Sequence, residues 1–250
     1  MLAAAGFPPL RVCLVGVAAV AAGTPAVYAV RGALDRRLAR SSSHSGLAHP
    51  VRLATGWIVA LAVLSAALAL VLSPLCLALY AAAVASALAA RLLRAVTAWE
   101  TVAAGVSVGL AGLAGWAAVA PLAPRVVTVF AFFTLWTVGG CAIAEDLADL
   151  DRDRFRGLTT VATVHGALAA ARAACVLSFA ALAATIALPM PGGFVNDLAL
   201  MIGVIVVAVP GAQLWHRPTS AEAVVFFDRV SLFPAAVLLV ALLPAVLKAL

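Results

Sequence analysis

Residues 145–166 read EDLADLDRDRFRGLTTVATVHG and lie between two long apolar stretches of the chain. Five of the ten carboxylate residues occur in the first nine positions of this segment. At helical spacing, Asp146, Asp149 and Asp153 share one face of a helix, where three like charges repel one another. A cation bound among them would remove that repulsion. Oxygen ligands without His or Cys suit Mg²⁺, which commonly also binds waters and a phosphate group. The segment therefore indicates a magnesium site.

The composition of the whole chain predicts a protein that lies in a membrane. The sequence has 250 residues, of which 66% are hydrophobic and 10% are charged, and its mean hydropathy is +1.16. These values argue against a soluble domain and favour an all-α, polytopic transmembrane helical bundle. The excess of six basic residues then concerns membrane topology, and a nucleic-acid partner is not expected. Only one basic residue, Lys248, is lysine, which we interpret as the codon bias of a GC-rich bacterial genome.

Eight segments have the length and polarity of membrane spans, each close to the ~20 residues that cross a bilayer. Short breakers separate several of them, such as Ser73–Pro74 and the Pro-rich residues 120–124. The eight segments are Leu10–Val30, Leu53–Leu72, Pro74–Leu93, Thr97–Ala118, Val126–Ala144, Ala167–Leu188, Val195–Leu214 and Val230–Lys248.

Eight alternating spans place four connections on one side of the membrane, at residues 31–52, 91–100, 145–166 and 215–229. These connections hold twelve of the sixteen basic residues, so the positive-inside rule assigns them to the cytoplasm. They also hold nine of the ten acidic residues, which that rule does not require. A cavity that opens at the cytoplasmic side and binds a metal and an anionic substrate explains why both the acidic and the basic residues gather on that side. Solvated loops are the alternative explanation.

The acidic segment carries a longer pattern, in which Gly157 and Thr160 follow the three aspartates. Written out, the pattern is DxxDxxxDxxxGxxT. It closely resembles the second aspartate-rich motif of the UbiA superfamily of intramembrane prenyltransferases, which also lies between two membrane helices. The resemblance covers most of the chain and implies a single, membrane-embedded prenyltransferase-like domain over residues 1–250.

The same family carries a first motif, NxxxDxxxD, at the cytoplasmic end of an earlier helix. Its best match here is RGALDRRLA, residues 31–39, in which Asp35 is the central aspartate. Arg31 stands at the Asn position and Ala39 at the last Asp position. Arg94 and Thr97 resemble a basic-x-x-Thr segment of the family. Family members usually have nine spans, so one span is missing or unrecognised in this chain.

The resemblance implies a reaction, a cofactor and a set of functional residues. Family members ionise an isoprenyl diphosphate with Mg²⁺ held between the two motifs, and an aromatic or lipid acceptor attacks the prenyl cation. We therefore expect a Mg²⁺-dependent enzyme of the bacterial cell membrane, in contact with membrane lipid, whose active site faces the cytoplasm. The expected metal ligands and catalytic residues are Asp35, Asp146, Asp149 and Asp153, and the expected diphosphate ligands are Arg31 and Arg94.

Several assignments have a simpler alternative. Arg31 and Asp35 are four residues apart, so they also suit a salt bridge at a helix end. Arg94 also suits a purely topological charge. Glu100 is costly to bury unless it faces a wet cavity, where it would act as a base or pair with Arg94.

Two other functions are compatible with the sequence. In a UbiA-type terpene cyclase, double bonds of the prenyl cation attack it and no acceptor is needed. A non-catalytic relative or a small transporter would use the same ionisable residues to bind or gate a substrate.

Overall fold

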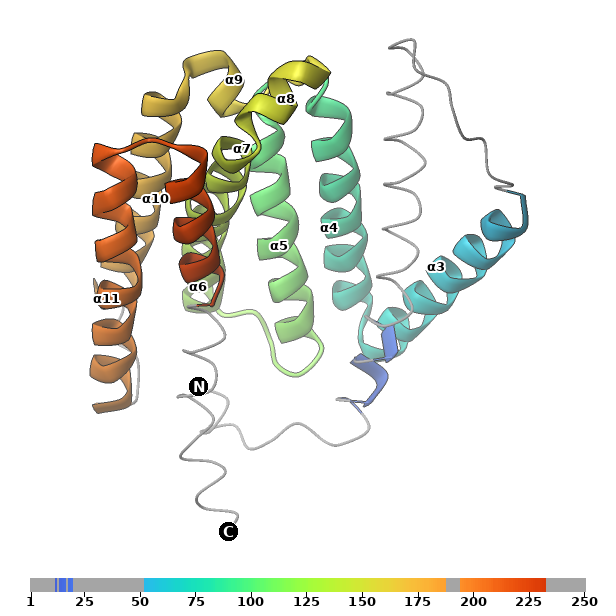
Figure 1. Ribbon diagram of the computed structural model, residues 1–250. Coiled ribbons are helices and arrows are strands. Elements are labelled where there is room, and N and C mark those ends of the chain that lie inside the picture. The colour runs from blue at the N-terminus through green and yellow to red at the C-terminus, as the bar shows by residue number, and fades with distance from the viewer. Residues whose placement is uncertain (1–11, 13, 17, 20–51, 188–193, 233–250) are drawn as a thin grey trace.

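The computed structural model describes residues 12, 14–16, 18–19, 52–187 and 194–232. Every regular element within these residues is a helix (Figure 1), which confirms the predicted all-α class. The elements are α3 (Arg52–Leu72), α4 (Pro74–Leu93), α5 (Glu100–Ala117), α6 (Pro124–Trp136), the π-helix η1 (Thr137–Ile143), α7 (Ala144–Ala148), α8 (Leu150–Arg156), α9 (Val161–His165), α10 (Ala167–Ala187), α11 (Phe194–His216) and a helical stretch over residues 220–232.

Among the described residues, three helical segments are long and apolar enough to cross a membrane: Pro74–Leu93, Glu100–Ala117 and Val126–Ala148. Three shorter apolar helices accompany them, at Trp57–Leu72, Ala167–Ala183 and Met201–His216. Large apolar side chains such as Trp57 and Val71 are highly exposed, as lipid-facing side chains are in a membrane protein. The first of the eight predicted spans lies mostly outside the described residues, as does most of the last.

The turn between α3 and α4 forms where the sequence predicts it. Ser73 is the N-cap of α4, and its hydroxyl accepts a hydrogen bond from the Cys76 N–H at 2.9 Å. Pro74 follows at the first helical position, where its missing N–H breaks no hydrogen bond. The observed bounds of α4 are those of the predicted span.

The last connection differs from its prediction. We expected residues 215–229 to form a charged connection, but a helix begins at residue 220 and only residues 217–219 lie between it and α11. Ala223, Phe226 and Val230 follow one another at helical spacing and are fully buried. This apolar stripe packs into the core, and Asp228 and Arg229 are exposed on the same helix rather than in a loop.

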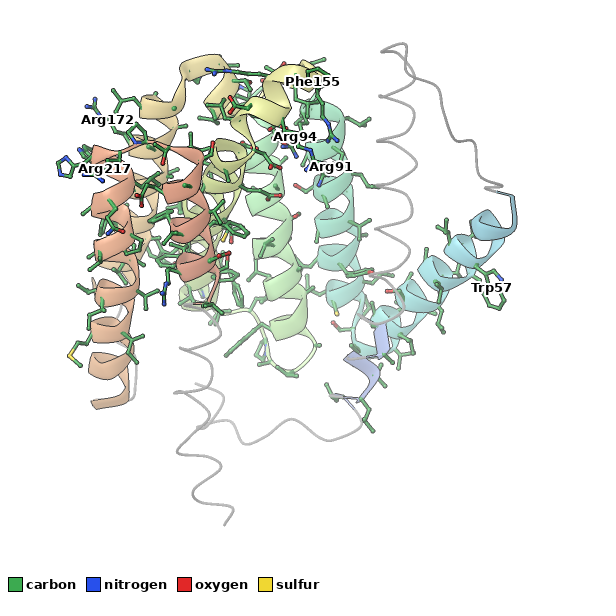
Figure 2. All side chains as sticks on the ribbon, viewed as in Figure 1. Trp57, Arg91, Arg94, Phe155, Arg172 and Arg217 are labelled. Carbon is green, nitrogen blue, oxygen red and sulfur yellow. The ribbon has the colours of Figure 1, made fainter. Side chains whose placement is uncertain are left out.

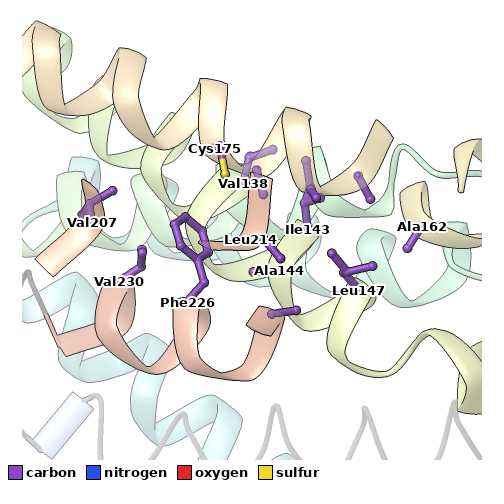
Figure 3. Close-up of a cluster of buried hydrophobic side chains, with 14 of the residues drawn as sticks. Val138, Ile143, Ala144, Leu147, Ala162, Cys175, Val207, Leu214, Phe226 and Val230 are labelled. Atoms are coloured by element: carbon purple, nitrogen blue, oxygen red, sulfur yellow. The ribbon is translucent and has the colours of Figure 1, made fainter. Parts of the chain in front are cut away.

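The π-helix η1 joins α6 to α7 and begins the segment that carries the aspartates. Its two glycines, Gly139 and Gly140, are buried at close approaches to neighbouring helices. A Cβ on Gly139 would lie 2.5 Å from the Leu177 Cβ of α10. A Cβ on Gly140 would clash with Val230. Figure 3 shows the apolar core that these contacts complete, between η1, α7, α10, α11 and the 220–232 helix. Small residues at a helix interface allow this close packing in a membrane protein.

The acidic segment folds into three short helices, α7, α8 and α9, at the end of the bundle where α4 ends (Figure 1). The helical face expected to carry all three aspartates is interrupted at Asp149, which lies between α7 and α8 with φ −93° and ψ 12°. Gly157 ends α8 in the left-handed conformation at φ 65°, which suits glycine. Thr160 then begins α9 with a capping box that it shares with Thr163. The glycine and threonine of the motif are thus a helix stop and a helix start.

Candidate functional site

Arg94 is the centre of a buried cluster of charges. It follows the last residue of α4, and Figure 2 places it beside α8, near Arg91. Its Nη2 lies 2.9 Å from Asp153 Oδ2 and 3.4 Å from Asp146 Oδ1. Its Nε lies 3.5 Å from Glu100 Oε1, at the first residue of α5. One guanidinium therefore joins carboxylates from three helices, α5, α7 and α8.

All three carboxylate residues of this cluster are buried. The exposed fractions are 6% for Glu100, 3% for Asp146 and 2% for Asp153. Burial by itself would lower the pKa of the Arg94 guanidinium, but the three carboxylates outweigh that effect and the pKa lies above its ordinary value. If all three acids are ionised, the cluster has two more negative than positive charges. Such an excess is costly in a buried site unless another cation, or a proton on one of the acids, balances it.

A backbone hydrogen bond fixes the two halves of the cluster to each other. The Thr159 N–H donates to the Arg94 carbonyl at 3.0 Å. Thr159 lies between the stop of α8 at Gly157 and the start of α9 at Thr160. The turn built by the glycine and threonine of the motif therefore holds the arginine next to the aspartates.

A cavity of about 250 Å³ opens beside the cluster, between α4, α5, η1 and α7. Arg91, Arg94, Glu100, Glu145 and Asp146 line its charged part. The remaining wall is made of small, mostly apolar residues, namely Ala87, Leu88, Ala90, Thr101, Ala104, Ser107, Val108, Thr137, Cys141 and Ala142. A site with an ionic end and an apolar wall can accept an amphiphilic molecule.

Asp149 is the member of the aspartate stripe that does not join the cluster. Its side chain is 43% exposed, and Oδ2 lies 3.8 Å from Arg152 Nη1. The two residues are three positions apart, so this pair is a local charge compensation on an exposed face of the segment. The break between α7 and α8 at Asp149 separates it from the two buried aspartates, which both contact Arg94.

The donor set fits Mg²⁺, although no group of three His, Cys, Asp or Glu side chains arranged to hold a metal occurs among the described residues. Asp146 Oδ2 is buried and accepts no hydrogen bond from an N–H or hydroxyl group in the described part of the chain, and the Asp146 side chain lies within hydrogen-bonding reach of Glu100. A buried oxygen of that kind is available to a cation. Mg²⁺ is often held by only one or two carboxylates, its other ligands being waters and substrate phosphates. Asp146 and Asp153, with Asp149 at the edge, would be the residues that hold it.

The structure joins some of the predicted site residues and leaves others outside its described part. It brings Arg94, Asp146 and Asp153 together, and it leaves Asp149 exposed between α7 and α8, where it pairs with Arg152. Arg31 and Asp35 lie outside the described residues. Of the two roles expected for Glu100, the described geometry favours pairing with Arg94.

Comparisons with known proteins agree with the fold. The model of the UbiA prenyltransferase family matches residues 1–233. Among solved structures, the chain is similar to the apo structure of a UbiA homolog from Aeropyrum pernix K1, with a TM-score of 0.66 and 20% sequence identity. The similarity covers 92% of this chain and 90% of the other. A search of curated proteins found no match.

Proposed function

The chain belongs to the UbiA prenyltransferase family, and on that premise we propose that this integral membrane protein is a Mg²⁺-dependent intramembrane prenyltransferase. Its substrate would be an isoprenyl diphosphate, and its acceptor an aromatic ring or a lipid. The ionic end of the cavity would face the cytoplasm, where the substrate diphosphate arrives. The observation that carries the proposal is the buried cluster of Arg94 with Asp146 and Asp153 beside a cavity with an apolar wall.

Different residues of the chain would bind the metal, the diphosphate and the prenyl chain. Asp146, Asp149 and Asp153 would hold Mg²⁺, with Asp35 contributing from the first motif. When bound, Mg²⁺ supplies positive charge that stabilises the departing diphosphate. Arg94 would donate charge-assisted hydrogen bonds to the same anion. The apolar wall would hold the prenyl chain and keep water away from the allylic cation.

A terpene cyclase is the second candidate function, and the products separate the two. The purified protein should be incubated with isoprenyl diphosphates of several lengths, with Mg²⁺ or EDTA, and with or without aromatic and lipid acceptors. A transferase releases pyrophosphate and forms a prenylated product only with an acceptor. A cyclic hydrocarbon formed without an acceptor would favour the cyclase. No Mg²⁺-dependent release of pyrophosphate under any condition would favour a non-catalytic relative.

We expect Asp149→Asn to lower the rate of pyrophosphate release about 10²-fold, because one ligand of the ion is lost. The exposed Asp149 side chain makes only a long ion pair with Arg152, so the melting temperature should hardly change. Arg152→Gln removes the same ion pair without touching the proposed ligand, and it should keep at least about half of the activity. Equal activity of Asp149→Asn and the unsubstituted protein would remove Asp149 from the site.

Arg31 replaces the asparagine of the first motif, and we propose that its guanidinium binds the diphosphate in place of part of a second metal site. Arg31→Ala and Arg31→Asn should then each weaken diphosphate binding about tenfold. Titration of the purified protein with inorganic pyrophosphate in the presence of Mg²⁺ measures this. If both variants bind pyrophosphate as the unsubstituted protein does, Arg31 only forms a salt bridge with Asp35.

A further inference from the structure

We propose that Arg94 and the divalent cation occupy the same position, between Asp146 and Asp153, at different times. Arg94 holds this position until diphosphate arrives, and the cation then takes it. The proposal rests on the proposed function, because it assumes that these aspartates bind the cation. It adds an order of events: the resting site is closed to metal by a side chain of the protein itself.

The geometry places the guanidinium where it competes with a cation. One nitrogen of Arg94, Nη2, is within 3.4 Å of oxygens from both buried aspartates. Asp146 and Asp153 come from two separate helices, α7 and α8, so the nitrogen bridges them as a shared cation would. A cation that binds both oxygens and a guanidinium that lies between them cannot take the same place.

The surroundings of Arg94 explain why it can move without being lost from the site. Glu100 contacts Nε, on the other part of the guanidinium, and belongs to α5 rather than to the aspartate segment. When Arg94 leaves the two aspartates, Glu100 still holds its Nε, and the terminal nitrogens of Arg94 are free to bind another acceptor. The cavity beside Arg94 then offers them a new acceptor, the diphosphate oxygens. The arginine would thus pass from two carboxylates to the anion as the cation enters.

The two ligands should therefore bind cooperatively, because diphosphate draws Arg94 away from the position that the cation needs. The unsubstituted protein should bind Mn²⁺, a spectroscopic substitute for Mg²⁺, weakly when alone and tightly with inorganic pyrophosphate. Arg94→Gln should bind Mn²⁺ alone about tenfold more tightly, since its competitor is gone. Electron paramagnetic resonance of free Mn²⁺ in titrations of the detergent-solubilised protein, compared with the same titrations of Mn²⁺ and pyrophosphate without protein, measures both affinities without any turnover.

Two further variants separate this competition from a general change of charge. Arg91→Gln removes a positive charge that lines the same cavity but belongs to none of the three ion pairs, so it should change Mn²⁺ affinity less than about threefold. Arg94→Gln combined with Glu100→Gln restores the net charge of the cluster, and it should keep most of the gain. If Arg94→Gln fails to fold, Arg94→Lys serves instead, because it keeps the positive charge but lacks the planar guanidinium that contacts two carboxylates at once. Its affinity for Mn²⁺ should lie between those expected for the unsubstituted protein and for Arg94→Gln.

Each remaining outcome bears on the proposal. The double variant could bind Mn²⁺ only as tightly as the unsubstituted protein, or Arg91→Gln could bind it as tightly as Arg94→Gln. Either result would mean that the higher affinity comes from net charge alone, and it would overturn the proposed exchange of Arg94 and the cation. If Arg94→Gln gains nothing while pyrophosphate still promotes Mn²⁺ binding, the metal site stands and only the exchange fails. If no variant binds Mn²⁺ even with pyrophosphate, the metal-dependent function fails together with the exchange.

Discussion

We expect Asp153→Asn to lower the rate of pyrophosphate release about 10³-fold, the largest effect on the proposed activity that we expect from any single substitution. Asp153 is the most buried carboxylate of the site and makes its shortest ion pair, at 2.9 Å from Arg94. Asparagine has nearly the same shape and still accepts a hydrogen bond from the arginine, but it lacks the charge that holds a divalent cation. The rate of pyrophosphate release at saturating Mg²⁺ measures the effect.

The fold should survive this substitution, because Glu100 and Asp146 remain next to Arg94 and no buried charge is left alone. Asp151→Asn is the matched control, since Asp151 is exposed and lies on the same short helix. It should keep nearly full activity. An Asp153→Asn protein that melts normally and retains more than about a tenth of the rate would contradict a metal-binding role for Asp153.

Gly139→Ala should destabilise the protein by about 1–3 kcal/mol, the largest loss of stability that we expect from adding a single methyl group. The new Cβ would lie 2.5 Å from the Leu177 Cβ and 3.0 Å from the Ala174 carbonyl oxygen. The carbonyl belongs to the backbone of α10, so relief requires one helix to move away from the other. Thermal unfolding in detergent, followed by circular dichroism, measures the change.

Gly115→Ala provides the comparison, because a Cβ there meets no atom within 4 Å. Alanine favours a helix by about 0.5–1 kcal/mol over glycine, so this variant should melt at the same temperature or slightly higher. If both variants melt at the same temperature, η1 and α10 can accommodate a methyl group at Gly139, and the predicted steric clash is wrong. The activity of Gly139→Ala should also fall, because η1 leads directly into the helix that carries Asp146.

Local sequence signals predicted much of the fold because they act over a few residues. Ser73 and Pro74 begin α4, and the polarity of the chain predicts where α4 ends. Gly157 ends α8 and Thr160 begins α9, so the spacing of these two motif positions follows from the turn between the two helices. These residues would form the same turns in many surroundings. Ser73 and Pro74 were identified from the sequence for that reason, whereas Gly157 and Thr160 were noted only as positions of the motif.

Features that depend on tertiary contacts escaped prediction. The π-helix η1 has no propensity of its own and forms where Gly139 and Gly140 bring two helices unusually close. The helix that begins at residue 220 was hidden by its charged residues, although the spacing of Ala223, Phe226 and Val230 is a signal that could have identified it.

The site was predicted in part for the same reason. Spacing grouped the three aspartates, but it could not foresee the break at Asp149 that leaves one of them exposed. Arg94 was found through a weak family pattern. The sequence already offered Glu100 as a partner of Arg94. That Asp146 and Asp153 also contact Arg94 required knowledge of which helix ends meet, because these two residues are more than fifty positions away from it along the chain.

The hydrogen bond between the Thr159 N–H and the Arg94 carbonyl limits how this scaffold can be recombined with relatives. It ties the connection between α4 and α5 to the turn after α8, so neither can be lengthened without disturbing the other. A chimaera that imports one of these connections alone would mismatch the pair. Residues 94–100 and 145–166 should therefore be exchanged as one cassette, even though they lie far apart in the gene.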